Sequence, residues 1–173
     1  MDKNNNNSKP TRRDFIYTLT ATLGVLGAGA SVWPIVSQMN PDSSVKALST
    51  VEVDISKVEE GKEITVMWRG KPVFIKRRTE NEVKSARNIS LEELPHPETD
   101  KKRVIKDEWL VVVGICTHLG CVPINGKGEY GGWFCPCHGS HYDTSGRIRK
   151  GPAPTNLEVP KYKFVGNDKI IIG

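Results

Sequence analysis

The sequence predicts a mostly β soluble domain preceded by a single membrane-spanning helix. The chain has 173 residues, a length that allows one globular domain and an appendage. An uncharged, mainly apolar stretch runs from Phe15 to Met39. Short strand-like runs separated by turn residues dominate residues 51–173, which favours a mostly β domain over a helical one.

The composition narrows the class of protein. Hydrophobic residues make up 37% of the chain and charged residues 26%, as in globular proteins rather than disordered ones. Only one stretch is long enough to cross a bilayer, which excludes a polytopic membrane protein. The formal net charge of +5 is modest and no long basic stripe carries it, so we expect no nucleic-acid partner.

The N-terminal segment predicts a membrane anchor. Residues 1–14 are polar and basic and form the expected cytoplasmic tail, because positive residues stay on the cytoplasmic side. As a helix, residues 15–39 would span about 37 Å, enough to cross a hydrocarbon core of about 30 Å. The alternative is a cleaved secretory signal, but its apolar region is usually only about 7–15 residues long. Trp33 and Pro34 also resemble an interfacial anchor more than a cleavage site.

Two further features flank this anchor. The sequence Thr11-Arg12-Arg13-Asp14-Phe15-Ile16 resembles the twin-arginine export signal, which addresses proteins that are exported already folded, often with a cofactor. Residues 40–50 are small and polar and include a proline, so they predict a linker to the soluble domain.

The soluble part is expected to consist mainly of short strands. Apolar or alternating runs predict strands at 51–55, on either side of the turn 69–72, at 109–115, and on either side of the turn 166–168. A short helix is expected over Glu80–Arg87. The spacing from Ser90 to Glu93 is that of a capping box and predicts a further helical turn, while 94–103 is a predicted loop.

Several other residues have ordinary structural explanations. We expect His96, between two prolines, to be solvated, and Asp143 to serve a turn. We expect Lys76–Arg78 to be the exposed end of a strand. The tryptophans expected in the core or at its edge are Trp68, Trp109 and Trp133.

All four cysteines lie in two short blocks that also contain histidine. The first block is Cys116-Thr117-His118-Leu119-Gly120-Cys121, and the second is Cys135-Pro136-Cys137-His138-Gly139-Ser140. Each block contains a glycine, which permits the backbone angles of a loop wrapped around a metal. The clustering therefore predicts a functional site in these two loops.

Three kinds of site fit these residue types. A structural zinc site suits the ligands, although Cys116-x-His118 is tighter than the usual spacing and six candidate ligands overfill a tetrahedral site. Two disulfides suit an exported protein but leave both histidines without a role. A [2Fe–2S] cluster would take one cysteine and one histidine from each block. The residue types alone leave these alternatives open.

Together the two blocks resemble the paired cluster-binding loops of Rieske iron–sulfur proteins of the cytochrome bc1 type. The similarity continues through residues 135–160 and covers about residues 12–173. The start at Met1 with a twin-arginine signal is similar to bacterial members. The step Tyr142-Asp143 resembles the bc1 branch more than the plastid b6f branch.

The resemblance implies a Rieske-type antiparallel β sandwich in residues 51–173, with an inserted cluster-binding subdomain near 111–151. It also implies one [2Fe–2S] cluster. The implied site residues are Cys116 and Cys135 on one iron, His118 and His138 on the other, Cys121 and Cys137 as a bridging disulfide, Ser140 and Tyr142 as hydrogen-bond donors to the cluster sulfurs, and Gly151–Pro154 as a covering loop.

The implied activity is that of a ubiquinol–cytochrome c reductase subunit. It would oxidise membrane ubiquinol with coupled proton release, through His138 or His118, and pass one electron to cytochrome c1. Cytochrome b and cytochrome c1 would be its partners, in a dimeric complex of the bacterial inner membrane, with the domain in the periplasm and a hinge at 42–49. The alternative is a membrane-tethered structural zinc or disulfide module without redox activity.

Overall fold

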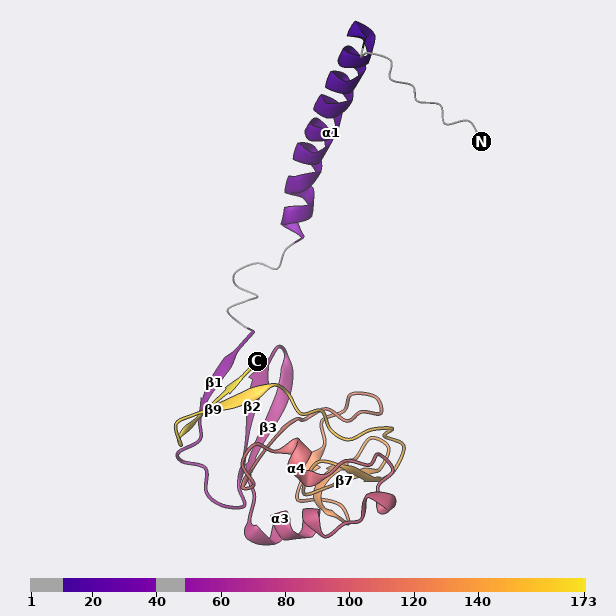
Figure 1. Cartoon of the computed structure of the whole chain (residues 1–173). Helices are drawn as coiled ribbons and strands as arrows, with labels where there is room; N and C mark the ends of the chain where they lie inside the picture. The colour runs from indigo at the N-terminus through magenta and orange to yellow at the C-terminus, as the bar shows by residue number, and fades with distance from the viewer. Residues whose placement is uncertain (1–10, 40–48) are drawn as a thin grey trace, which may run out of the picture. The chain divides into compact units, whose positions relative to one another are not determined.

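The computed structural model describes residues 11–39 and 49–173, which belong to two separate units (Figure 1). The first contains helix α1 (Arg12–Gln38), and the second is the mostly β domain. The expected linker 40–50 and tail 1–14 therefore fall largely outside the described residues.

Helix α1 begins three residues before the uncharged stretch because Thr11 caps it. The Thr11 hydroxyl accepts a hydrogen bond from the Asp14 N–H at 3.3 Å, and the Asp14 carboxylate accepts one from the Thr11 N–H at 2.9 Å. This reciprocal arrangement satisfies two N–H groups that otherwise lack partners at a helix start. The helix is long and apolar enough to cross a membrane, as the sequence predicts.

Residues 49–173 form three antiparallel sheets. The first has the order β1 (Val51–Asp54), β10 (Lys169–Ile172), β9 (Tyr162–Val165). The second has the order β2 (Glu63–Trp68), β3 (Lys71–Arg77), β4 (Trp109–Val113). The third has the order β5 (Ile124–Asn125), β6 (Gly131–Cys135), β7 (Ser140–Asp143), β8 (Ile148–Lys150). The third sheet is inserted in the chain between β4 and β9, as expected for a subdomain carried by a sandwich.

The second sheet lies between two hydrophobic clusters. On one face, side chains such as Val73 and Val111 pack in a cluster with Ile170 of the first sheet. On the other face, Phe74 and Val112 pack in a cluster with residues of the third sheet, namely Trp133, Tyr142 and Ile148. Burial on both faces explains why β4 is a continuous apolar run rather than an alternating one.

The segment between β3 and β4 carries short helices and contains two departures from expectation. Helix α3 (Glu80–Arg87) has the predicted bounds. The predicted helical turn after Ser90 is present as a 3₁₀ turn, η1 (Leu91–Glu93), but the expected capping box is not, because the Ser90 side chain makes no capping hydrogen bond. The predicted loop 94–103 ends in a short helix, α4 (Asp100–Arg103), whose first and last side chains are buried.

The prediction that Lys76–Arg78 is an exposed strand end is wrong. Lys76 and Arg78 are only 3% and 2% exposed. Lys76 pairs with Glu82 of α3 at 2.6 Å, and Arg78 pairs with Asp100 of α4 at 2.6 Å. Burial of these cations is possible because each faces a carboxylate from the helical segment.

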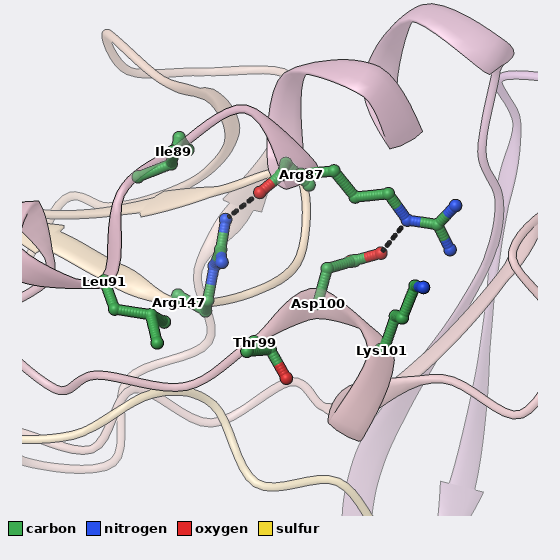
Figure 2. A pocket seen from close by; sticks show the side chains of 8 residues that line it. Arg87, Ile89, Leu91, Thr99, Asp100, Lys101 and Arg147 are labelled. Carbon is green, nitrogen blue, oxygen red and sulfur yellow. Dashed lines mark hydrogen bonds and ion pairs between the residues drawn. The ribbon is translucent and has the colours of Figure 1, made fainter.

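Around Asp100 the helical segment is joined to the rest of the domain by further polar contacts. Figure 2 shows Arg87 donating to Asp100, at 3.4 Å, and Arg147 donating to the backbone carbonyl beside Arg87. That carbonyl belongs to Ala86, and the distance is 2.6 Å. Because Arg147 follows β7, these contacts join α3 to the sheet that carries the second Cys–His block.

Gly132 should tolerate no side chain, since β6 and β7 approach closely there. An added Cβ would lie 2.0 Å from the Asp143 carbonyl oxygen. We expect Gly132→Ala to lower the free energy of unfolding by about 2–4 kcal/mol, because backbone must move to relieve the clash. Denaturant unfolding of the full chain, followed by circular dichroism, measures this change.

Gly27→Ala is the control, since nothing lies within 4 Å of its added Cβ. It should leave unfolding of the domain unchanged. Equal stability of the two variants would contradict the close approach of β6 and β7.

Candidate metal centre

The two Cys–His blocks occupy loops at strand ends. The first block follows β4 closely, and the second joins the end of β6 to the start of β7. Cys135 is the last residue of β6 and Ser140 the first of β7, and they pair across the two strands. The strands therefore fix both ends of the second loop.

The two loops close in the same way. The Gly120 N–H donates to the Cys116 carbonyl at 3.0 Å, and the Gly139 N–H donates to the Cys135 carbonyl at 3.0 Å. Both glycines have positive φ values, +84° and +75°, in the left-handed region that favours glycine. The turn glycines expected from the sequence thus shape two matching loops.

A disulfide between Cys121 and Cys137 connects the loops, which confirms the predicted bridge. Cys116 and Cys135 are free thiols, each 2% exposed. The bridge sulfurs lie close to the Cys135 sulfur, within 4.8 Å. A disulfide sulfur is no thiolate, however, so only Cys116 and Cys135 have a thiol available to bind a metal.

The two histidines face one another across the loops. The rings of His118 and His138 have centroids 4.7 Å apart and are perpendicular. His118 Nδ1 is buried and has no hydrogen-bond partner among the described residues. A buried nitrogen without a partner is costly, and a metal ligand bond would satisfy it. The donor set of two free thiols and two imidazoles thus fits a mixed cysteine–histidine cluster.

Tyr142 hydrogen-bonds to the Cys116 thiol and favours its ionised form. Its hydroxyl donates to Cys116 Sγ at 3.3 Å. Burial opposes ionisation of Cys116, but the hydrogen bonds it receives, that from Tyr142 first, lower the pKa of its thiol overall. Burial is the main cause that raises the pKa of Tyr142, and the hydrogen bond to the Cys116 sulfur raises it further. Tyr142 therefore remains a protonated donor toward the sulfur.

Ser140 and Cys135 are further neighbours of the Cys116 sulfur. The buried Ser140 hydroxyl accepts from the Ala153 N–H at 3.2 Å, which leaves its proton free to donate, and Ser140 helps to lower the pKa of the Cys116 thiol. Burial raises the pKa of Cys135, and the neighbouring Cys116 raises it further.

The segment after β8 packs on the second loop. At Gly151 an added Cβ would lie 2.5 Å from the Gly139 carbonyl oxygen. Thr117, between Cys116 and His118, donates from its hydroxyl to the Thr155 carbonyl at 2.7 Å. Sequence reasoning did not single out Thr117, because nothing in its local pattern indicates a partner so far along the chain.

Other residues singled out from the sequence have structural roles. His96 is exposed and its Nδ1 accepts from the Asn156 N–H at 3.4 Å. Asp143 accepts from the N–H groups of Ser145 and Arg147, each at 2.9 Å, as expected for a turn residue. Trp109 and Trp133 are buried in the core, as predicted.

Two family models match the chain. Residues 2–42 match the Fe–S subunit TAT signal of ubiquinol–cytochrome c reductase, and residues 49–163 match the Rieske [2Fe–2S] domain. These matches identify the cofactor as one [2Fe–2S] cluster and the role as electron transfer. They do not support the alternative of a zinc or disulfide module without redox activity. The TAT signal together with α1 indicates a membrane-anchored protein.

Curated relatives resemble the chain over nearly its whole length. The ubiquinol–cytochrome c reductase iron–sulfur subunit of Rickettsia prowazekii is 53% identical, over 99% of this chain and 98% of the relative. The subunit of the same name from Bradyrhizobium diazoefficiens is 53% identical, over 95% of each chain.

A solved structure supports the same assignment. A chain of a hyperthermophilic respiratory Complex III matches with a TM-score of 0.55 and 28% identity, covering 89% of this chain and 98% of that one. The free thiols, the facing imidazoles and the bridging disulfide described above occur within the matched domain. The chain therefore belongs to the family of ubiquinol–cytochrome c reductase iron–sulfur subunits.

Proposed function

We propose that this chain takes one electron from ubiquinol and passes it to cytochrome c1, within a dimeric cytochrome bc1 complex that also contains cytochrome b. Relatives named for this reductase, at 53% identity, support the assignment. The main supporting observation is that two loops joined by one disulfide together present two free, buried thiols and two imidazoles that face each other.

The proposed ligands are Cys116 and Cys135 on one iron and His118 and His138 on the other. Because His118 Nδ1 is the buried nitrogen without a partner, we assign the metal bond to Nδ1. Nε2 is then left to exchange a proton. Replacing two thiolates by neutral imidazoles gives a bound cluster a potential of about −150 to +300 mV, high enough to receive an electron from a quinol.

His138 is the proposed contact for the quinol hydroxyl. Its side chain is exposed, whereas His118 is half-buried. His138 Nε2 would accept the quinol proton as the electron leaves, and His118 Nε2 is the second candidate. A midpoint potential that falls as pH rises across the alkaline range is expected from this proton exchange. A potential independent of pH in that range would contradict it.

The proposed arrangement places the N-terminus in the cytoplasm, α1 in the bacterial inner membrane, and the domain with its subdomain 111–151 in the periplasm. The basic residues Arg12 and Arg13 at the start of α1 support this orientation. Export through the twin-arginine route would carry the domain across the membrane already folded.

Reductase activity tests the proposal directly. Membranes that lack the chain should neither oxidise ubiquinol with cytochrome c as acceptor nor show the cluster. The wild-type chain should restore both properties. Restoration of activity by a chain that binds no iron would contradict the proposed function.

Tyr142→Phe should lower the midpoint potential without loss of the cluster. The variant removes the hydrogen bond to Cys116 Sγ, which stabilises negative charge on the sulfur. A differential hydrogen-bond energy of about 1 kcal/mol corresponds to roughly 40 mV for one electron. A redox titration followed by electron paramagnetic resonance (EPR) measures the shift. Tyr130→Phe, which alters a tyrosine of the β5–β6 loop, is the control and should show none.

A further inference from the structure

A cluster of charged residues lies where the second sheet meets the third. Glu63 of β2 and Lys76 of β3 stand opposite each other in the register of these strands. Lys76 is buried, at 3% exposure, although lysine is seldom buried. Neither residue belongs to the metal centre, and no local pattern in the sequence singles out Glu63.

Both side chains reach the third sheet. Lys76 Nζ pairs with Glu82 at 2.6 Å, donates to the Asn125 side-chain oxygen at 3.3 Å, and lies 5.4 Å from the centre of the Trp133 ring. Glu63 accepts a hydrogen bond from the Trp133 indole N–H at 3.0 Å. Asn125 lies in β5 and Trp133 in β6, so the two contacts hold neighbouring strands.

We propose that Glu63 and Lys76 are positioning residues that hold β6 through Trp133 and thereby place Cys135 at the metal centre. Trp133 is fully buried and stacks on Phe74, with ring centres 6.1 Å apart, so it cannot shift independently of the second sheet. Cys135 lies two positions further along the same strand, a rise of roughly 7 Å. The inference rests on the proposed function, in which Cys135 is a ligand.

Glu63 makes this contact sensitive to pH. Burial raises the pKa of Glu63 to about 7, against the opposing effects of the Trp133 hydrogen bond and then Lys76. The groups that face it are Lys76 from β3 and the neutral Trp133 from β6. Lys76 is already paired with Glu82 of α3, so it compensates the Glu63 charge only in part. Glu63 therefore changes charge near neutral pH.

The sign of each effect follows from the raised pKa. Glu63 binds its proton more tightly in the folded chain, so its contribution to stability falls as pH rises from about 4.5 to 7 and is constant above that. The negative charge that forms near pH 7 opposes addition of an electron nearby. It should therefore lower the midpoint potential across that range.

Glu63→Gln in the full, cluster-loaded chain tests the inference. The glutamine oxygen still accepts from Trp133 but does not titrate. The wild-type potential should show a falling step near pH 7, and the variant should lack it, matching wild type below the step and exceeding it above. Glu60→Gln, which removes a charge from an exposed side chain nearby in sequence, should keep the step.

Two readouts separate the possible failures. Infrared spectra of the wild-type chain should show a protonated-carboxyl band that disappears as pH rises through about 7, and Glu63→Gln should lack it. Lys76→Met should alter the EPR line shape, because Asn125 and Glu82 lose their common partner. Wild-type chain without a [2Fe–2S] signal would overturn the proposed function. An intact signal whose line shape is unchanged by Lys76→Met and whose pH profile is unchanged by Glu63→Gln would overturn this inference alone.

Discussion

A chain with serine in place of Cys135 is expected to bind no [2Fe–2S] cluster. Cys135 is one of two free, buried thiols at the site, and a serine hydroxyl is a poor substitute for a thiolate ligand. Iron and acid-labile sulfide should fall from the two of each that a [2Fe–2S] cluster contains to background. Low-temperature EPR of the reduced chain should show no signal.

The matched control removes the other two cysteines. Cys121→Ser together with Cys137→Ser leaves all four proposed ligands and deletes only the bridge. Its sequence separation of 16 residues predicts a loss of about 3 kcal/mol in stability, so this variant should retain a cluster that is lost more readily on warming. Full cluster content in Cys135→Ser would contradict the ligand assignment.

Asp100→Leu should have the largest effect on folding. The Arg78 side chain is 0% exposed and pairs with the Asp100 carboxylate, which also accepts from the Ser145 hydroxyl at 2.7 Å. Leucine would leave the buried Arg78 charge uncompensated. A cost of about 3–5 kcal/mol in the free energy of unfolding is expected. Denaturant unfolding of the full chain measures it.

The control for this variant is Asp107→Leu. Asp107 pairs with Arg87 by its carboxylate but has a side chain that is 62% exposed. An exposed ion pair is worth less than about 1 kcal/mol, so this variant should unfold close to wild type. A similar loss of unfolding free energy in both variants would contradict the expectation that the buried Arg78–Asp100 pair stabilises the fold more than the exposed Arg87–Asp107 pair.

Local patterns in the sequence predict much of the fold. The hairpin of β2 and β3 follows from the turn predicted at 69–72, of which only Arg69 and Gly70 form the turn itself, and the bounds of α3 coincide with the predicted helix. The two Cys–His blocks can be located as a candidate site from the clustering of cysteine and histidine in the sequence alone. Their assignment to a cluster and a disulfide depends on the family resemblance, because the residue types leave zinc and disulfide sites open.

What local patterns miss is contact between distant residues. The sequence pattern indicates surface charges at Lys76 and Arg78, because the carboxylate that compensates the buried Arg78 charge lies 22 residues away, in a stretch predicted to be loop. Glu63 receives its hydrogen bond from Trp133, 70 residues later. Thr117 donates to a carbonyl 38 residues away. Each of these contacts joins residues that only the tertiary packing of the domain brings together.

Low-temperature EPR of the ascorbate-reduced full chain tests most directly whether the chain holds a [2Fe–2S] cluster. Together with iron and sulfide analysis, it should give a rhombic signal of the mixed cysteine–histidine type and a complete [2Fe–2S] content. Reduction by so weak a donor would also show a potential high enough for quinol oxidation. Absence of the signal, with one zinc or no metal bound, would contradict electron transfer by this chain.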